Sequence, residues 1–580
     1  MEISDKDYEL VENILLNNKS EFNTLQREFI ELFENKTIIA GPGAGKTTSL
    51  AAKIVILLKN LNSSESRAGV CIITHTNVAV NEINNALIKA GIGKIDHPHF
   101  IGTINEFFNR FCVLPLFKYT CNHNNLVFDK EHPNDLEFYK SFLSVERSFM
   151  SEDVKGKIAF RMHNSNLIFN INDKCLDISN TTNWHLFEKY KDLLLEAKLT
   201  RKSQGFLTHD DTFLFSTFFL QNLKFKEILR NRFKYIFLDE FQDTPPEGKV
   251  LLDELFKTQN NIYQLIGDPY QTISFDHPMP SINESEVFRI NITNRFGNQI
   301  TEHLNTILPQ SEMKSISGKE SLSPIILLYK NEEDIYPAYQ AIIKEYEEIN
   351  FRFRENNKKD KVLVLIKTWS NRIKKGVNYK EKNLKKNKSI NSELKTLVIE
   401  FVVGKLATNG EKISTINNWI SKHPKMLSLH TLLINIIKNG IDDDNKIQLC
   451  KLINQFLTEN GVDNIGLDDN IYGNIENIIK NQRTPEVLSD ETDDIFTIHS
   501  VKGETLRSVL LVDFGRKPFT KVLLHKYGII DDDSYRYTDQ NLLYVAMSRV
   551  TDLFVFAMAE NDWTTEIAEV FQKNWAIKRV

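Results

Sequence analysis

The chain has 580 residues, of which 41% are hydrophobic and 26% are charged, and its formal net charge is −5. This length exceeds what one hydrophobic core supports, so we expect a soluble globular protein with several domains. The negative net charge excludes attraction of nucleic acid by overall charge alone, and such a partner would need local basic surface.

The five cysteines are scattered and include no paired C-x-x-C motif. This usage is typical of a reducing cytoplasm rather than of a disulfide framework. Cys112, Cys121 and His123 lie near one another, but two small residues and a surface histidine are a simpler interpretation than a zinc site. The acidic N-terminus does not resemble a signal peptide, and the sequence contains no run of 18 apolar residues that would predict a membrane span.

Nine short apolar runs rich in β-branched residues occur along the chain, and polar residues or glycine follow them. Such runs are typical of buried parallel strands, and the segments between them have helical patterns. The runs cover residues 37–41, 69–76, 234–240, 262–268, 323–330, 361–367, 494–500, 508–514 and 552–559. Because they form an early and a late group, we predict an α/β fold with two α/β layers.

Two long stretches, residues 107–205 and 373–488, lack such runs and have helical spacing of their apolar residues. Both are predicted to be mostly helical insertions into the α/β domains. The second insertion opens with a lysine-rich stretch, residues 372–390. This stretch is either a solvated loop or a contact to a phosphate backbone, and the sequence does not separate the two.

The segment TIIAGPGAGKTTSL, residues 37–50, places a glycine-rich loop between a predicted strand and a predicted helix. Its glycines let the backbone curl so that N–H groups face a phosphate chain. These glycines are Gly41, Gly43 and Gly45. Lys46 can then reach the β- and γ-phosphates, and the Thr47 hydroxyl can ligate Mg²⁺. Ala40 occupies the first glycine position of the strict pattern, but the flanking strand and helix still predict a phosphate-binding loop.

The stretch YIFLDEFQDTPPEGK contains four carboxylates at the end of a predicted buried strand. A phosphate loop needs an acidic residue on a neighbouring strand for Mg²⁺, and Asp239 stands there. Glu240 can polarise the attacking water. Thr244, two prolines and Glu247 form a capping-box arrangement, which makes Glu247 a helix-start residue. Asp243 is either a cap or a polar contact near the nucleotide.

Together, the motifs GPGAGKTT, DEFQDT and GDPYQTI resemble those of the UvrD/Rep/PcrA group of superfamily 1 DNA helicases. Further motifs follow in the order of that family, namely LQREF (25–29), THTNVAV (74–80), IGTINEFF (101–108), NITNRFGNQI (291–300), TIHSVKGET (497–505) and NLLYVAMSR (541–549). The resemblance extends over nearly the whole chain. It implies two RecA-like P-loop NTPase domains, each a parallel sheet flanked by helices and carrying a mostly helical insertion.

These resemblances also imply domain boundaries. The first RecA-like domain would comprise residues 1–106 and 206–284, around the insertion 107–205. The second would comprise residues 285–372 and 489–580, around the reduced insertion 373–488.

The same resemblance implies a nucleotide site that binds ATP with Mg²⁺. Gln26 would contact the adenine, and Glu504 the ribose. The phosphate-loop contacts would come from Gly41, Pro42, Gly43, Ala44, Gly45, Lys46, Thr47 and Thr48. Thr47 and Asp239 would hold the metal. The catalytic residues would be Lys46, Glu240, Gln271, which couples the γ-phosphate to DNA, and the two arginine fingers Arg295 and Arg549. Arginines suit this role because they neutralise charge on the transferred phosphoryl group.

Contacts to single-stranded DNA are implied for Thr74, His75, Asn77, Thr103, Phe275, His499 and Lys502. His75 stands where the family usually has phenylalanine, and Phe275 is the aromatic residue that remains after the Gln271 motif. Bases are expected to stack on these two side chains. An ordinary core position is the alternative interpretation of Phe275.

Two departures from the family pattern carry further expectations. Asn294 stands where the family has a tyrosine that stacks on adenine, so other purine nucleoside or deoxynucleoside triphosphates are expected beside ATP. Glu504 directly follows Gly503 in KGET, which resembles the small helicases of phage-defence operons, notably the Gabija helicase subunit. That resemblance implies an OLD/TOPRIM-type nuclease partner. About thirty residues follow Arg549, too few for a nuclease domain of usual size.

The leading hypothesis is an ATP-dependent DNA helicase or translocase on single-stranded or tailed DNA, 3′→5′ by resemblance. It would act in the cytoplasm as part of an anti-phage defence system. The alternative is a DNA-stimulated, NTP-hydrolysing sensor or regulatory subunit with little unwinding. A degenerate scaffold is disfavoured because the polar residues that hydrolysis requires are all present.

Overall fold

The protein is described here by a computed structural model that covers residues 3–580 with several gaps. The gaps are residues 17–19, 64–66, 75–76, 94, 123–125, 130–131, 133–134, 147–148, 171–174, 179–186, 274–281, 374–389, 407–418, 421–422, 424, 468 and 484–493. His75, His123, Phe275 and most of the lysine-rich stretch therefore lie outside the described residues. The chain divides into a larger unit, Met1–Lys330, Ala338–Leu363 and Ile498–Val580, and a smaller unit, Asn331–Pro337 and Val364–Thr497.

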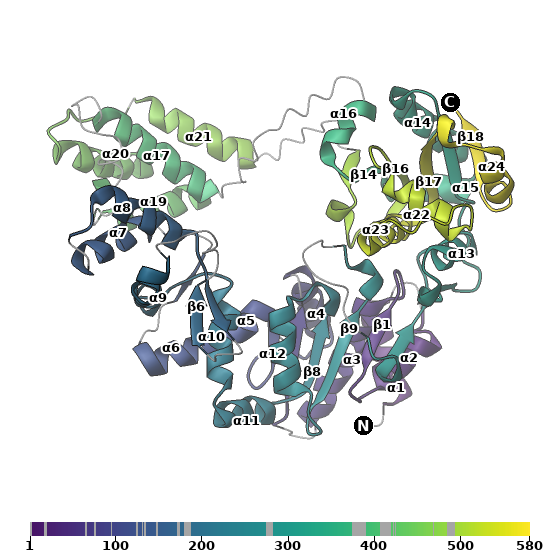
Figure 1. Cartoon of the computed structure of the whole chain (residues 1–580), viewed down its shortest axis with the longest axis horizontal. Helices are drawn as coiled ribbons and strands as arrows, with labels where there is room; N and C mark the ends of the chain where they lie inside the picture. Colours follow the sequence, from purple (N-terminus) through teal and green to yellow (C-terminus); the bar gives the residue numbers. More distant parts are fainter. Residues whose placement is uncertain are drawn as a thin grey trace. The chain divides into compact units, whose positions relative to one another are not determined.

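The first sheet of the larger unit has six parallel strands in the order β10-β1-β9-β8-β2-β3 (Figure 1). The strands are β1 (Thr37–Ala40), β2 (Gly69–Thr74), β3 (Phe100–Thr103), β8 (Phe233–Asp239), β9 (Ile262–Gly267) and β10 (Val287–Ile290). Because parallel strands end at the same edge, the phosphate loop after β1, Asp239 of β8 and Asp268 after β9 meet there.

Strand β10 corrects the predicted boundary between the two RecA-like domains. The second domain was expected to begin at residue 285, yet β10 pairs with β1 from Thr37–Val287 to Ala40–Ile290. The first lobe therefore extends to the end of β10. The run VFRI is too short and too polar for its sequence to predict a strand. The hydrogen bonds with β1 define it as one.

Helices cover both faces of the first sheet. They are α1 (Asp5–Leu15), α2 (Thr24–Glu31), α3 (Lys46–Ser63), α4 (Asn77–Lys89), α5 (Ile104–Phe108), α10 (Asp211–Leu220), α11 (Leu223–Arg232) and α12 (Pro246–Phe256). One apolar cluster joins α1–α4 to the sheet, and a second, rich in phenylalanine, joins α5 and α10–α12 to it. Helix α3 is buried around most of its circumference because its segment AAKIVILL is apolar at nearly every position.

The first insertion is mostly helical, as predicted, and has its own core. It contains η1 (Asn109–Val113), α6 (Leu114–Cys121), β4 (Val127–Phe128), α7 (Asp135–Glu146), α8 (Glu152–His163), β5 (Leu167–Asn170), β6 (Cys175–Ile178), α9 (Phe187–Ser203) and β7 (Phe206–Leu207). The pairs β4-β7 and β5-β6 form two small sheets that the sequence pattern did not predict.

The second lobe also belongs to the larger unit. Its parallel strands run in the order β14-β16-β17-β13-β18, with β13 (Ile325–Tyr329), β14 (Asp360–Val364), β16 (Leu506–Val512), β17 (Val550–Ala559) and β18 (Ala576–Arg579). The short strands β11 (Ile292–Thr293) and β12 (Lys314–Ser315) pair separately. The helices are α13 (Asn298–Ile307), α14 (Ile335–Ile349), α15 (Phe351–Glu355), α22 (Pro518–Lys526), α23 (Tyr537–Met547) and α24 (Thr565–Phe571).

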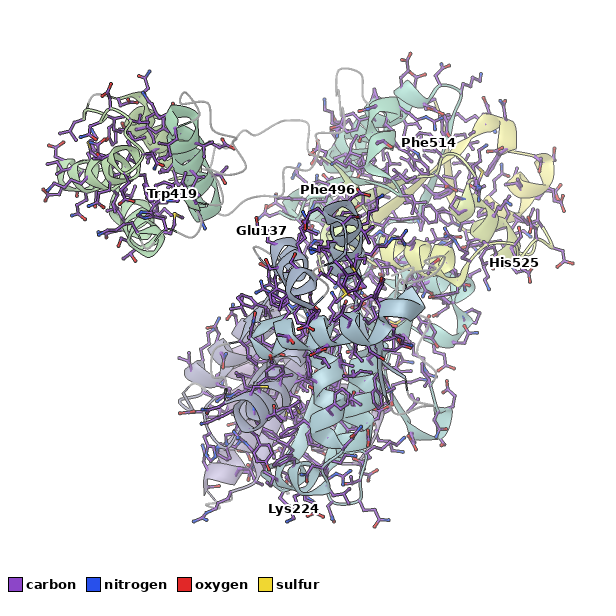
Figure 2. All side chains as sticks on the ribbon, turned by 60° about the vertical axis from the view of Figure 1, so that its left-hand side comes forward. Glu137, Lys224, Trp419, Phe496, Phe514 and His525 are labelled. Atoms are coloured by element: carbon purple, nitrogen blue, oxygen red, sulfur yellow. The ribbon has the colours of Figure 1, made fainter. Side chains whose placement is uncertain are left out.

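The smaller unit is a helical bundle, which agrees with the predicted helical insertion. It contains α16 (Ser370–Ile373), α17 (Ile390–Leu406), α19 (Met426–Asn439), α20 (Asp443–Thr458), α21 (Asn470–Arg483) and the short strand β15 (Ile495–Thr497). Buried aliphatic side chains of α17, α19, α20 and α21 form its core. Trp419, labelled in Figure 2, packs edge-on against Phe456 of α20, with ring centroids 6.0 Å apart.

All nine predicted strands are present, and the predicted α/β class is confirmed. The strands β3, β10 and β18 were not predicted. Among the described residues, no helix combines the length and apolar character that crossing a bilayer requires.

The phenylalanine-rich cluster generates a prediction about stability. The side chain of Phe107 is fully buried and its ring contacts five other phenylalanines, namely Phe100, Phe108, Phe111, Phe233 and Phe256. Phe107→Ala is expected to lower the free energy of unfolding by about 3–5 kcal/mol, through lost burial and the cavity left behind. Denaturant unfolding measures this loss, and Tyr119→Ala, at a side chain that is 83% exposed, is the control expected to change little.

Candidate active site

A cavity of about 470 Å³ lies at the carboxyl edge of the first sheet, and residues of both lobes line it. The lining residues are Ala40, Gly41, Pro42, Gly43, Ala44, Gly45, Lys46, Thr47, Thr48, Glu240, Asp268, Gln271, Asn294, Arg295, Lys319, Lys358, Gly503, Thr505, Arg549 and Thr551. The whole predicted phosphate loop and all five predicted catalytic residues are among them. A volume of this size is within the range of cavities that bury a small organic ligand.

The phosphate loop has the backbone conformation that its glycines permit. Gly43 and Gly45 both have φ near +77°, a region that side-chain-bearing residues rarely adopt. Space is also restricted, because a Cβ atom at Gly43 would lie 2.5 Å from Cβ of Arg295. Helix α3 begins at Lys46, so its free N–H groups and the positive end of its dipole adjoin the cavity. The loop is therefore shaped for a phosphate chain.

Gln26 supports the loop from behind. Its Nε2 donates to the carbonyl oxygen of Ala44 at 2.9 Å, and its Oε1 accepts from the backbone N–H of Asn23 at 2.9 Å. The side chain is 4% exposed and does not line the cavity. A Cβ atom at Gly45 would lie 2.5 Å from Nε2 of Gln26. The position of the Gln26 side chain therefore leaves no room for a side chain at residue 45. The predicted contact of Gln26 with the base stays a prediction.

Lys46 joins the loop to the end of β8. Its Nζ lies 3.1 Å from Oδ1 of Asp239 and forms a second ion pair with Oε1 of Glu240. Against the effect of burial, the charges of these two carboxylates raise the pKa of Lys46. Burial raises the pKa of Asp239, and Lys46 offsets that only in part. Burial also opposes ionisation of Glu240, but the charge of Lys46 outweighs it and lowers the pKa of that carboxyl to about 2. Glu240 is therefore a carboxylate at neutral pH and available as a base.

The backbone at Glu240 is in the left-handed region, with φ +52° and ψ +43°. This conformation is uncommon for a residue with a side chain and is concentrated at functional sites. It reverses the chain immediately after β8, so that Glu240 lines the cavity while Asp239 stays buried under the loop. The Gln242 side chain fixes this turn, because its Nε2 donates to Glu240 and its Oε1 accepts from the backbone N–H of Asp268 at 3.1 Å.

The donors for a divalent cation fit Mg²⁺. Thr47 lines the cavity with a hydroxyl, and Asp239 is a carboxylate that is 2% exposed. Oδ1 of Asp239 has no hydrogen-bond partner among the described residues, although Lys46 lies within ion-pair distance. Mg²⁺ prefers one or two protein oxygens supplemented by water and phosphate oxygens, and this pair supplies such a set. In the described part of the chain, no cluster of three His, Cys, Asp or Glu residues could hold a metal by itself.

Two arginines bring positive charge into the cavity from the side of the second lobe. The guanidinium of Arg295 donates to the carbonyl oxygen of Ser548 at 2.8 Å, and Arg549 donates to Oε1 of Gln271 at 2.9 Å. Burial and the charge of Arg549 lower the pKa of Arg295 to about 9, and burial lowers that of Arg549 to about 10. Among the described residues neither arginine forms an ion pair within 4 Å, although the carboxylates of Asp268 and Glu240 act on Arg549 from a greater distance. Two neighbouring cations that repel one another are suited to an anionic ligand.

Some residues that line the cavity had no assigned role. Lys319 and Lys358 come from loops of the second lobe whose sequences carry no motif. Asp268 stood inside a recognised motif, and its carboxylate accepts from the backbone N–H of Tyr270 at 3.0 Å and from Nε2 of Gln271 at 2.8 Å. Burial outweighs these hydrogen bonds and raises the pKa of Asp268 to about 6. Asp268 therefore orients Gln271 toward the cavity.

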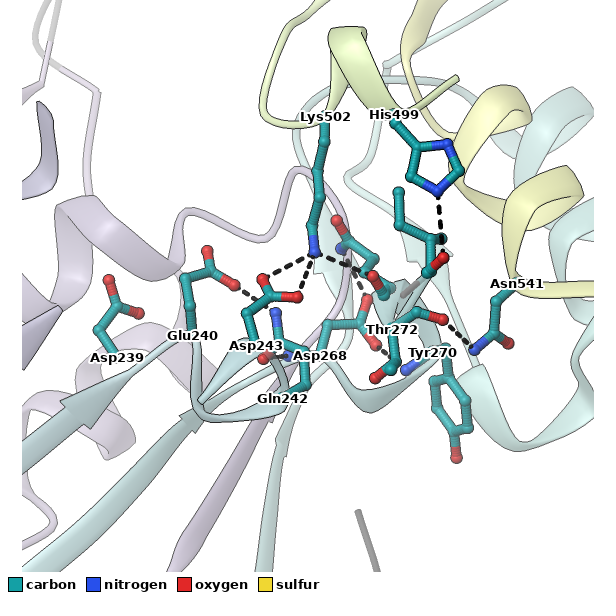
Figure 3. Close-up of polar contacts among 12 residues, drawn as sticks. Asp239, Glu240, Gln242, Asp243, Asp268, Tyr270, Thr272, His499, Lys502 and Asn541 are labelled. Atoms are coloured by element: carbon teal, nitrogen blue, oxygen red, sulfur yellow. Dashed lines mark hydrogen bonds and ion pairs between the residues drawn. The ribbon is translucent and has the colours of Figure 1, made fainter. Parts of the chain in front are cut away.

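The second lobe holds the main chain that follows β9 (Figure 3). Nζ of Lys502 donates to the carbonyl oxygen of Gln271 at 3.0 Å, and Nδ2 of Asn541 to that of Thr272 at 2.8 Å. Nε2 of His499 lies 3.1 Å from the carbonyl oxygen of Ile273. Three successive carbonyl groups of the first lobe are thus bound by side chains of the second.

Asp243 completes this connection. Both of its carboxylate oxygens accept from Nζ of Lys502, each at 2.7 Å. Of the two interpretations of Asp243, a helix cap does not occur, and a polar contact near the nucleotide stays a prediction because Asp243 does not line the cavity. The predicted capping box is wrong, because Pro245 is the N-cap of α12 and no side chain caps the helix. Glu247 does lie in the first turn of α12, as predicted, and is exposed.

The candidate DNA-binding residues fall into three groups. His75 and Phe275 lie outside the described residues, and Asn77 begins α4 without a described side chain. Thr103 caps α5, its hydroxyl accepting from the backbone N–H of Glu106 at 3.3 Å, and Thr74 is buried at the end of β2. His499 and Lys502 contact the first lobe as described above, so contacts of these residues with DNA stay predictions.

Glu504 also stands apart from the predicted arrangement. Its carboxylate accepts from Nζ of Lys361 at 2.6 Å, and the neighbouring residues Gly503 and Thr505 line the cavity instead. Its contact with a ribose stays a prediction.

Residues 22–275 match the family model described as the UvrD/REP helicase N-terminal domain. The chain is 25% identical over 245 residues to the probable DNA helicase II homologue of Mycoplasma capricolum, a match that covers 41% of this chain and 32% of that protein. It is 28% identical over 257 residues to the ATP-dependent DNA helicase Rep of Buchnera aphidicola, covering 43% of this chain and 36% of that protein.

A third relative is the ATP-dependent DNA helicase srs2 of Schizosaccharomyces pombe, 26% identical over 259 residues, with 41% of this chain and 28% of that protein covered. The chain spans about a third of the length of these curated relatives. The matches show similarity between the first half of this chain and the N-terminal domain of UvrD/REP helicases.

The pairing of Asp243 with Lys502 generates a prediction about coupling between the lobes. A double-mutant cycle with Asp243→Asn and Lys502→Met is expected to give a coupling free energy of about 1 kcal/mol, because both side chains are mostly buried. Denaturant unfolding of the four proteins measures it. The control cycle uses Asp153→Asn and Lys157→Met, an ion pair of the same 2.7 Å length whose side chains are 74% and 73% exposed. Its coupling is expected to be close to zero, and equal coupling in both cycles would contradict the prediction.

Proposed function

We propose that the protein is an ATP-dependent DNA helicase or translocase that moves on single-stranded DNA in the 3′→5′ direction. The observation that carries the proposal is the meeting of Lys46, Glu240 and Gln271 of one lobe with Arg295 and Arg549 of the other in a single cavity. This set matches the parts that phosphoryl transfer to water requires. The three relatives named as DNA helicases support DNA as the second ligand.

The roles of the residues follow from their positions. Lys46 and the start of α3 would bind the β- and γ-phosphates, and the triphosphate would take over Lys46 from its carboxylate partners. Glu240, a carboxylate at neutral pH, would accept a proton from the attacking water. Arg295 and Arg549 would neutralise charge on the transferred group. Thr47 and Asp239 would hold Mg²⁺, which supplies charge neutralisation at the phosphate oxygens.

Movement on DNA would depend on the connection between the lobes. Arg549 donates to the side chain of Gln271, while Lys502 binds the carbonyl oxygen of the same residue. A change at the γ-phosphate would therefore reach His499 and Lys502, which are the candidate DNA contacts. Release of Lys502 from Asp243 would free its ammonium group for a DNA phosphate.

A second candidate function is a DNA-stimulated, NTP-hydrolysing sensor with little unwinding. Asn294 lines the cavity where a stacking aromatic residue was expected, and an amide offers no aromatic face to a base. This favours relaxed base selectivity, so other purine nucleoside and deoxynucleoside triphosphates are proposed as substrates beside ATP.

The proposal extends to a role in anti-phage defence with an OLD/TOPRIM-type nuclease as partner and a cytoplasmic location. It rests on the KGET sequence at residues 502–505 and on its resemblance to the Gabija helicase subunit. Co-purification with the product of an adjacent nuclease gene is the expected observation, and an isolated gene without such a neighbour would contradict it.

The assignment of the catalytic base leads to a first prediction. Glu240→Gln is expected to lower kcat for NTP hydrolysis by about 10²–10⁴-fold, because an amide cannot accept the proton of the attacking water. Lys46→Ala is expected to abolish hydrolysis by removing the ammonium group from the phosphates. Steady-state release of phosphate measures both. Glu247→Gln, the same substitution seven residues on at an exposed position, should leave turnover unchanged. Normal turnover by the Glu240→Gln protein would falsify the site assignment.

Strand displacement separates the two candidate functions. A helicase is expected to unwind a duplex with a 3′ single-stranded tail in the presence of ATP, and to leave a 5′-tailed duplex intact. The Lys46→Ala protein serves as the inactive control. Robust hydrolysis without displacement, alone and with the nuclease partner, would support the sensor and refute the helicase.

A further inference from the structure

The first insertion contains a second polar cavity, remote in sequence from the phosphate loop. It has a volume of about 150 Å³ and is lined by residues of α7, α8, α9 and β7. This volume is too small for a whole nucleotide but exceeds that of one water molecule several-fold. The cavity is therefore of a size for a small ion and its nearest water.

Three cationic side chains of α9 line this cavity, and each is at most 7% exposed. Two of them have carboxylate partners, since Nε of Arg201 lies 2.7 Å from Asp135 and Nζ of Lys202 lies 2.5 Å from Asp211. The third, Lys198, has no ion pair within 4 Å among the described residues. Buried charges in proteins are normally paired, so Lys198 leaves one positive charge unbalanced.

Lys198 also has unused hydrogen-bonding capacity. Its Nζ donates to the carbonyl oxygen of Ser165 at 2.6 Å and lies 5.3 Å from the ring centroid of Tyr139. An ammonium group has three N–H bonds, and the contact with Ser165 uses one of them. Burial and the charge of Lys202 lower the pKa of Lys198 to about 8, and the charges of Asp211 and Asp135 offset this only in part.

Two further polar groups at the cavity have no hydrogen bond within the described part of the chain. Nδ1 of His163, at the end of α8, is buried without a partner. The Tyr139 side chain is 2% exposed, and none of its recorded contacts is a hydrogen bond of its hydroxyl. Buried polar groups are nearly always satisfied, so the unpartnered Nδ1 of His163 beside the incompletely satisfied Lys198 points to a missing ligand.

We infer that this cavity is a binding site for a phosphate group, held by Lys198, Tyr139 and His163. A tetrahedral oxyanion supplies the charge that Lys198 lacks and accepts hydrogen bonds from all three side chains. The ligand is free phosphate or the terminal phosphate of a strand. The site is separate from the nucleotide cavity and extends the proposed function, because it gives the first insertion a ligand of its own.

Calorimetric titration of the full-length Lys46→Ala protein with inorganic phosphate tests the inference, since that background removes the phosphate-loop lysine. One phosphate per chain is expected to bind. Tyr139→Phe is expected to weaken binding about tenfold, which corresponds to about 1.4 kcal/mol, and Lys198→Met to abolish it. Lys140→Met, at an exposed lysine of α7, is the matched control and should bind as before.

The Tyr139→Phe variant keeps the test decisive if Lys198→Met fails to fold, because the lost hydroxyl makes no hydrogen bond with any described residue. Affinity unchanged by both substitutions would mean an adventitious ion only and would overturn the inference, as would an absence of binding. Competition by a 5′-phosphorylated oligonucleotide, but not by its 5′-hydroxyl counterpart, would support the site with a strand end as ligand. Binding without such competition would support it with free phosphate as ligand.

Discussion

The ion pairs of Lys46 with Asp239 and Glu240 are the interaction on which the arrangement of the site depends. They attach the phosphate loop after β1 to the end of β8, across the strand that lies between them. An enclosed lysine without polar partners would be strongly destabilising, so these two acids keep the cation in place before a nucleotide arrives. A triphosphate can then replace them, which leaves Glu240 free to act on water and Asp239 free to hold Mg²⁺.

The residues after β9 form the joint between that site and the second lobe. Side chains of the second lobe bind the carbonyl oxygens of Gln271, Thr272 and Ile273, in addition to the contact of Arg549 with the Gln271 side chain. Such a joint tolerates sequence change, because every residue type has the same carbonyl group. This explains how the aromatic residues that usually follow this motif can be absent while the lobes remain connected.

The sequence predicted the α/β class and nine strands, and its five candidate catalytic residues all line the cavity, because these features depend on local pattern and on short motifs. It did not predict β10 or the roles of Asp243 and Gln242. Those depend on contacts with segments distant in the chain, such as Lys502 and the backbone N–H of Asp268. Proline and glutamate after Thr244 matched a capping box, yet Pro245 itself became the cap. A local motif was outweighed there by the turn that Glu240 imposes.

An enclosed lysine does not by itself indicate a ligand site. A comparison of the partners of three such lysines shows what distinguishes the cavity in the first insertion. Lys46 has two carboxylates, and its pKa is raised. Lys53 has none, but its Nζ donates to the carbonyl oxygens of Phe29 and Leu32, and aromatic rings lie within 5 Å of it. Its surroundings are therefore complete although burial lowers its pKa. Lys198 has one carbonyl partner, an adjoining cavity and two unsatisfied neighbours. An anion in this cavity would complete its environment.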